Sequence, residues 1–432
     1  MYTRVLSNSE YGTVDLFQTV GTLLLPVVTI CIAEAVFRFG MDCSISSYIV
    51  LKQSLFIATI GLGVGCLIIG IVYCNYNRNL VLLLFSTHLI MASYKTILSQ
   101  YVRSQKRIKL YITDNLFQTF IICTVNIVAV AYFKLGIWGY FSGYIFANSF
   151  SIIFLSYKIK LIRNIKQIGI SLKIIKRMLS YSIPLIPNSI CWWISNSLDR
   201  VMVSVILGVS QNGILAVVYK IPNMITLMFD FFIQAWQISI NEEIDSGQKS
   251  DFHNDVFKYV SVITCIICFW AMLISNYILP VIVGQSFVIA QRYIPIFSLA
   301  IVFFVFAQFL GTFFSAYKKT DQAFYTNLIA AVVNVILNML LIPEFGLYGA
   351  GVATLCSYII LWFIRTIKIR KLTVITYPHQ FWYSLAILCC QTILISIGMN
   401  ISALCLEVIL FVLNSNTIRE LFRIKSRGNY HV

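Results

Sequence analysis

Residues 257–283 read FKYVSVITCIICFWAMLISNYILPVIV, and Lys258 is their one charged residue. A helix that crosses the hydrocarbon core of a bilayer needs about 20 mainly apolar residues in a row. A buried strand or a helix of a soluble core is much shorter. This stretch therefore predicts a transmembrane helix.

The composition of the whole chain extends this prediction to the rest of the molecule. Of 432 residues, 59% are hydrophobic and 11% are charged, and the mean hydropathy is +0.85. A soluble domain carries about 25% charged residues. We therefore expect an all-α polytopic membrane protein and exclude a water-soluble fold.

Similar apolar stretches recur along the chain. We expect about thirteen transmembrane helices, because each needs about 20 residues and the connections are short. The expected spans are 13–33, 48–73, 79–98, 109–133, 137–157, 183–207, 213–239, 257–283, 287–316, 323–342, 346–366, 382–398 and 400–415.

The net charge of +16 comes from basic residues gathered in alternate loops. These loops hold Arg103 to Lys109, the segment 158–182, Arg365 to Lys371 and the C-terminal tail. The positive-inside rule places such loops in the cytoplasm, so the charge indicates topology rather than nucleic-acid binding. An odd number of spans then puts the N-terminus outside, and we expect that one helix is missing before Met1.

Two short patterns recur at a similar offset. Leu6 to Gly12 and Leu207 to Gly213 share the spacing L-x-x-S-[E/Q]-x-G, and G-x-x-G occurs at both Gly136 and Gly346. Parallel repeats are one way in which transporters build two lobes. The expected domains are an N-terminal lobe at 1–157, a basic cytoplasmic linker at 158–182, a C-terminal lobe at 183–366, and two extra helices with a basic tail at 367–432.

Four segments together resemble the polysaccharide-unit flippases of the Wzx type, in the MATE-like superfamily of multidrug, oligosaccharidyl-lipid and polysaccharide exporters. They are YTRVLSNSEYGTVDLF (2–17), SYSIPLIP (180–187), LDRVMVSVILGVSQNGILAVVYKI (198–221) and PEFGLYGAGVAT (343–354). The resemblance implies two pseudo-symmetric helical lobes around a central cavity. It also implies alternating-access transfer of an undecaprenyl-pyrophosphate oligosaccharide, an O-antigen (lipopolysaccharide) or capsule unit, from the inner to the outer leaflet of a bacterial inner membrane. Polymerase and other assembly proteins are the implied partners.

Charged side chains within the spans are the candidate substrate site, because a bare charge in the bilayer is costly and marks a substrate path. Arg200 and Lys220 lie about ten residues either side of a turn, so we expect them at similar depth. The polar residues of the following span recur every three or four positions and form a stripe on one helix face. The cavity candidates are Asn196, Arg200, Lys220, Asn223 and Gln234. The alternative is that the polar stripes of the two helices pack against each other.

The N-terminal lobe offers further candidates. Glu34, Arg38 and Asp42 recur at intervals of four, which is typical of a salt-bridge ladder at a helix end. The alternative is that Arg38 receives the pyrophosphate, and Lys95 either joins the cavity or extends to the cytoplasmic interface. Glu34 and Asp230 are candidates for binding a coupling H⁺ or Na⁺. Membrane potential alone is the other energy source, and no cofactor or metal is expected.

Two other functions compete with a flippase. A cation-coupled drug antiporter of the same superfamily would need an acidic and aromatic site, which the basic candidates argue against. A membrane polysaccharide polymerase or glycosyltransferase would carry a large outer loop or a catalytic pair, and neither is visible. The chain has no G-x-x-x-x-G-K-[ST] motif for ATP hydrolysis.

Overall fold

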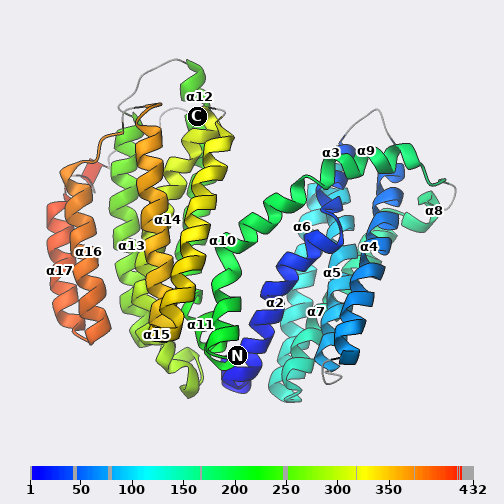
Figure 1. Cartoon of the computed structure of the whole chain (residues 1–432), viewed down its shortest axis with the longest axis horizontal. Coiled ribbons are helices and arrows are strands. Elements are labelled where there is room, and N and C mark those ends of the chain that lie inside the picture. The colour runs from blue at the N-terminus through cyan, green and yellow to red at the C-terminus, as the bar shows by residue number, and fades with distance from the viewer. Residues whose placement is uncertain are drawn as a thin grey trace. The chain divides into compact units, whose positions relative to one another are not determined.

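The structure is a computed structural model, and its described part is entirely helical (Figure 1). The chain forms two compact units, Met1–Ser197 and Leu198–Val432. The described residues are 2–41, 46–75, 80–165, 168–246, 252–317, 319–373, 375–415, 417 and 419–420.

The first unit begins with a capped helix and a broken span. The Ser7 hydroxyl accepts from the Glu10 N–H, and the Glu10 carboxylate accepts from the Ser7 N–H, which is a capping box. Pro26 lies in the last turn of α2, and Cys31 has a positive φ of 49° just before the next helix begins. The helices are α1 (Tyr2–Val5), α2 (Asn8–Val28), α3 (Ile32–Gly40), α4 (Ser47–Asn75), α5 (Leu80–Ser104), α6 (Ile108–Asn126), the π-helix η1 (Ile127–Tyr132), α7 (Gly136–Lys158), α8 (Leu161–Ile165) and α9 (Leu172–Ser182).

The core of the first unit lies where α3, α4 and α5 meet. Val36, Leu51 and Val102 are fully buried there, and Met178 of α9 joins the same cluster. The segment 158–182, expected as a linker, therefore packs on the bundle through α9. The division between the compact units falls between Ser197 and Leu198, within α10 (Leu185–Ile206).

The second unit is arranged around α14 (Ile294–Ala316). Phe306, Phe309 and Phe313 of α14 are fully buried, because other helices of the unit surround it. The remaining helices are α11 (Val209–Val218), α12 (Lys220–Ser246), α13 (Phe252–Ile282), the 3-10 helix η2 (Gln285–Arg292), α15 (Thr320–Ile369), α16 (His379–Ile397) and α17 (Asn400–Leu413).

The two G-x-x-G motifs adopt the same local structure. Gly136 and Gly346 have φ values of 58° and 57°, a region that side chains disfavour. A Cβ at Gly139 or Gly349 would lie 3.0 or 2.1 Å from a backbone oxygen of a preceding helical turn. Gly346 divides α15 into the two expected spans 323–342 and 346–366.

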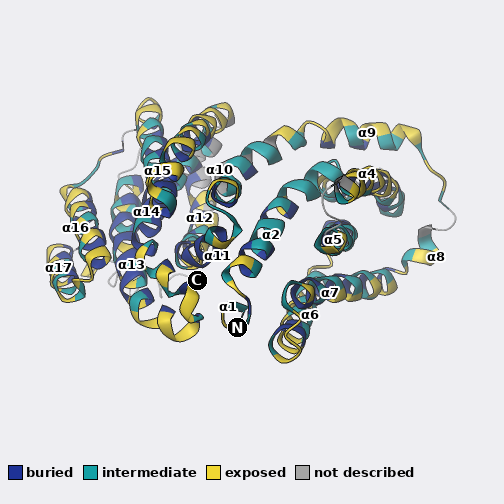
Figure 2. Cartoon of the chain, turned by 60° about the horizontal axis from the view of Figure 1, so that its bottom comes forward, coloured by how far each residue is buried: buried dark blue, intermediate teal, exposed yellow. Residues whose placement is uncertain are grey.

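Eight helices in the described part are long and apolar enough to cross a membrane, or nine if the bent pair α11 and α12 counts as one span. Each expected span overlaps one or two helices, but the expected number of thirteen is not established. The helix α17, for example, has 14 residues. Exposed residues recur along α4 and α6 (Figure 2). Apolar side chains such as Leu67 and Phe120 are among them, as a lipid-facing surface requires.

Candidate functional site

The helix α12 has one apolar face, which anchors it to the second unit. Ile225, Phe229, Ile233 and Trp236 recur every three or four residues and are buried. The Trp236 ring stacks on Phe309 of α14, with centroids 5.2 Å apart. This packing fixes the direction of every other side chain on α12.

The polar side chains of α12 lie away from that core. Lys220, Asn223 and Gln234 are exposed, and Thr226 is half-buried. Asp230 is also half-buried, and its Oδ1 accepts a hydrogen bond from Gln308 Nε2 at 3.1 Å. A polar stripe along a membrane-spanning helix is costly against acyl chains, so it indicates contact with water or with a polar ligand.

Arg200 belongs to a cluster with Asp199 and Tyr219. The guanidinium carbon of Arg200 lies 4.8 Å from the centroid of the Tyr219 ring, a cation–π arrangement. The Tyr219 hydroxyl donates to Asp199 Oδ2, and the backbone N–H of Arg200 donates to Asp199 Oδ1 at 2.9 Å. Asp199 thus accepts hydrogen bonds from a side chain of the next helical segment and from its own helix.

The turn between Arg200 and Lys220 is not a simple hairpin. The axis bends by 43° between α11 and α12, and Lys220 is the first residue of α12. Lys220 therefore lies at the bend itself, one helix of ten residues after the turn at Gly208. The side chain of Asn196 lies outside the described part of the structure.

The candidates on α3 are accessible. Glu34 and Arg38 are both exposed, and they form no ion pair with each other. Asp42, the third member of the expected ladder, lies outside the described residues. The described pair therefore offers a free carboxylate and a free guanidinium on one helix.

Lys95 is fixed inside the first unit. It is half-buried on α5, and its Nζ donates to Asn115 Oδ1 of α6 at 2.8 Å. The ammonium therefore points into the bundle rather than toward the membrane interface.

Arg365 corrects the sequence interpretation of the last basic loop. We expected Arg365 in a cytoplasmic loop, but α15 continues to Ile369 and Arg365 is buried. Its Nη2 donates to Asn327 Oδ1 at 2.9 Å, its Nε to Thr326 Oγ1 at 3.3 Å, and its Nη1 to the Ala307 carbonyl. The guanidinium therefore joins α14 to both halves of α15.

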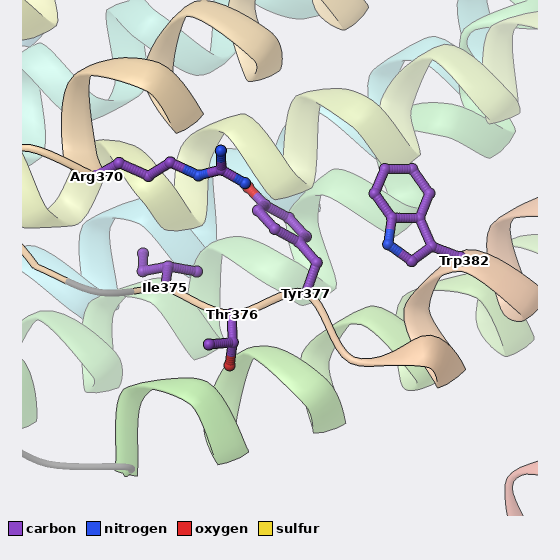
Figure 3. Close-up of a pocket in the computed structure, with 5 residues that line it drawn as sticks. All are labelled: Arg370, Ile375, Thr376, Tyr377 and Trp382. Carbon is purple, nitrogen blue, oxygen red and sulfur yellow. The ribbon is translucent and has the colours of Figure 1, made fainter.

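A pocket of about 520 Å³ lies in the connection between α15 and α16. Figure 3 shows the guanidinium of Arg370 beside the hydroxyl of Tyr377, with Trp382 across from them. Burial raises the pKa of the Tyr377 hydroxyl, which also hydrogen-bonds to Thr366 Oγ1 at 2.6 Å. None of the expected substrate residues lines this pocket.

Known proteins similar to this chain are membrane flippases and transporters. A family model described as "Lipid II flippase MurJ" matches residues 284–418. Two archaeal relatives are an uncharacterised membrane protein, MJ1068, of Methanocaldococcus jannaschii (23% identity over 36% of this chain and 29% of the relative) and the probable low-salt glycan biosynthesis flippase Agl15 of Haloferax volcanii (24% over 44% and 40%). The matches thus span less than half the length of either relative.

Solved structures support the same fold. A lipid II flippase MurJ in an inward closed conformation matches with a TM-score of 0.62 at 15% identity, over 95% of this chain and 98% of that one. An inward-facing MATE multidrug transporter matches with a TM-score of 0.70 at 11% identity, over 86% and 93%. The family model described as "Polysaccharide biosynthesis protein" matches residues 1–292. The chain is therefore a multi-pass membrane protein of the polysaccharide biosynthesis protein family, and its fold is that of the MATE-like superfamily.

Proposed function

We propose that the chain transfers a lipid-linked oligosaccharide, an undecaprenyl-pyrophosphate O-antigen or capsule unit, from the inner to the outer leaflet of a bacterial inner membrane by alternating access. The polar stripe of α12 is the observation that carries this proposal. It presents amide and ammonium groups along a spanning helix, and such groups suit a hydrated, anionic headgroup. The flippase relatives are consistent with the same substrate class.

The energetic requirement is set by the charge of the headgroup. A bare charge at the middle of the bilayer costs at least about 3 kcal/mol. Arg200 and Lys220, with Asn223 and Gln234, lower this cost by pairing with the phosphates and hydrogen-bonding to the sugars. Within the first unit taken by itself, Arg38, Lys95 and Asn196 stay the proposed substrate contacts.

Export of the headgroup also gains from the membrane potential. Moving about two negative charges out of a negative interior is favoured by roughly 4–5 kcal/mol per 100 mV. Glu34 and Asp230 are the carboxylates that we propose for ion coupling, because both lie within reach of water or a polar neighbour. The C-terminus is cytoplasmic in this topology, and a polymerase would take up the product on the outer side.

Reconstitution tests the proposed function directly. The purified chain is placed in vesicles that contain a fluorescent undecaprenyl-pyrophosphate glycan, and a membrane-impermeant quencher reports the outer leaflet. We expect leaflet transfer well above that of empty vesicles. Transfer at the background rate, or efflux of a cationic dye in its place, would contradict the proposal and favour a drug antiporter.

A further inference from the structure

A carboxyl group without hydrogen-bond partners lies inside the first unit. Asp114 of α6 is completely buried, and neither of its carboxyl oxygens has a partner. The hydroxyl of Ser151, on α7, lies beside it, is also completely buried, and has no partner. A buried ionised carboxylate that lacks donors is strongly destabilising, so this pair needs a further explanation.

The surrounding amide groups do not satisfy Asp114, because they are paired with other groups. Gln118 Nε2 donates to Asn148 Oδ1 at 2.7 Å, between α6 and α7. Lys95 Nζ donates to Asn115 Oδ1 at 2.8 Å, and it forms no ion pair with Asp114. The Gln118 amide and the Lys95 ammonium thus donate to other acceptors, which leaves the Asp114 carboxyl with the Ser151 hydroxyl beside it.

The cluster lies at one depth, near the end of the bundle that the basic loops flank. Lys95 precedes the last residue of α5 by nine positions, Asp114 follows the first residue of α6 by six, and Ser151 precedes the last residue of α7 by seven. At 1.5 Å per residue, all three lie roughly 9–14 Å from the helix ends. Adjacent helices thus bring them together.

We propose that Asp114 is a proton-binding site, with Ser151 and Lys95 as the groups that distinguish its two protonation states. In the protonated state, the neutral carboxyl donates a hydrogen bond to Ser151 Oγ, and Lys95 stays on Asn115. When the proton leaves to water, Lys95 leaves Asn115 and pairs with the carboxylate. In each state the carboxyl group has a hydrogen-bond or ion-pair partner. Proton exchange is therefore coupled to a movement of the Lys95 ammonium between Asn115 and Asp114, both on α6.

A proton fits this cluster better than a metal ion does. Asp114 and Ser151 supply three oxygens without partners, fewer than a hard cation usually takes. Among the described residues, Lys95 is the one charged group that acts on Asp114, and its ammonium repels a metal cation. The packed face of α7 contributes the neutral Asn148 and Ser151. The inference does not depend on which lipid the chain carries.

Infrared difference spectroscopy tests the proposal on the purified full-length chain in lipid nanodiscs. The spectrum in acid buffer minus that in alkaline buffer reports the C=O stretch of protonated carboxylic acids. We expect a band from a carboxyl in an apolar environment, and we expect D114N to remove it. The matched control is D321N, which changes an exposed aspartate at the start of α15 and keeps the band.

Two more variants keep the test decisive. In K95Q the band persists into more alkaline buffer, because the ammonium that favours the ionised carboxylate is gone. D114E retains an acid, shifts the frequency of the band, and serves as the test if D114N does not fold. No acid band in the unmodified chain, or the same band in D114N or D114E, would overturn the proton site. An unchanged titration in K95Q would overturn the role of Lys95.

Discussion

The indole Nε1 of Trp236 donates a hydrogen bond to Thr312 Oγ1 at 3.1 Å, and both groups are buried. This bond joins α12 to α14, the central helix of the second unit. Because α12 carries the polar stripe, the same bond sets the direction in which that stripe faces. The stability of the second unit and the orientation of the candidate site are therefore linked.

Replacing Thr312 with Val should destabilise the second unit. The substitution keeps the shape of the side chain but leaves the indole N–H without a partner, which costs about 1–3 kcal/mol. We expect a lower melting temperature in a thermal-shift assay of the detergent-purified chain. W270F is the matched control, because Trp270 is 40% exposed, and its effect should be small. Equal melting temperatures for T312V and the unmodified chain would contradict the link.

The polar stripe of α12 should be accessible to water. In a background without the twelve native cysteines, N223C and Q234C should react with a charged maleimide that does not dissolve in lipid. M228C is the control, because Met228 is 59% exposed on a different face of α12 and should face acyl chains. Equal labelling at all three positions would show that the polar stripe of α12 is no more accessible to water than the control face.

Arg200 and Lys220 should each be needed for transport. Loss of one charge-assisted hydrogen bond costs about 1.5–3 kcal/mol, which corresponds to a roughly tenfold to hundredfold loss. We expect R200Q and K220Q to lower leaflet transfer by at least about tenfold. K109Q, which changes an exposed lysine in the first turn of α6, should retain transfer. Full activity in both single variants would remove these residues from the mechanism.

Gly311 should not tolerate a larger side chain. A Cβ at Gly311 would lie 2.6 Å from Arg365 Nη1, so G311A must displace the buried guanidinium from its three partners. We expect a thermal destabilisation of about 1–3 kcal/mol, because buried acceptors lose their donor. G70A is the control, since no atom lies within 4 Å of a Cβ at that position. A G311A chain as stable as G70A would show that Arg365 does not join the helices.

Alkaline pH should weaken the connection between α15 and α16 through Tyr377. Burial raises the pKa of this hydroxyl above its ordinary value of about 10. The folded chain therefore favours the protonated phenol, and this stabilisation is complete below pH about 10 and is lost as the pH rises above it. We expect the melting temperature of Y377F to fall less than that of the unmodified chain above pH about 10. Y325F, at a position 60% exposed, should behave like the unmodified chain.

The sequence predicted the spans well because hydrophobic length determines them. It also predicted the division of α15 at Gly346, where a glycine pattern marks a backbone that other residues disfavour. It could not predict the burial of Arg365, because basic residues close to a helix end usually lie at the interface. Only its partners Asn327 and Thr326, nearly forty residues earlier in the chain, explain that burial.

The candidate site was predicted less completely. The stripe on α12 follows from helical spacing, and the structure shows Lys220, Asn223 and Gln234 exposed. The bend before Lys220 was not predicted, although Pro222 marks it, because proline has no N–H to donate to the Val218 carbonyl four residues earlier. Asp114 was visible in the sequence as an acid within a span. Its lack of partners depends on how α5, α6 and α7 pack, which spacing along one helix cannot reveal.

The guanidinium of Arg365 also bears on how the chain is made. Ala307, Thr326 and Asn327 are synthesised before Arg365, so the acceptors are already in the bilayer when the last turns of α15 leave the ribosome. The arginine therefore enters the membrane beside three hydrogen-bond acceptors, which offset the free-energy cost of burying its charge. A truncated product that ends before residue 365 would leave those acceptors empty and expose an unfinished bundle to quality-control proteases.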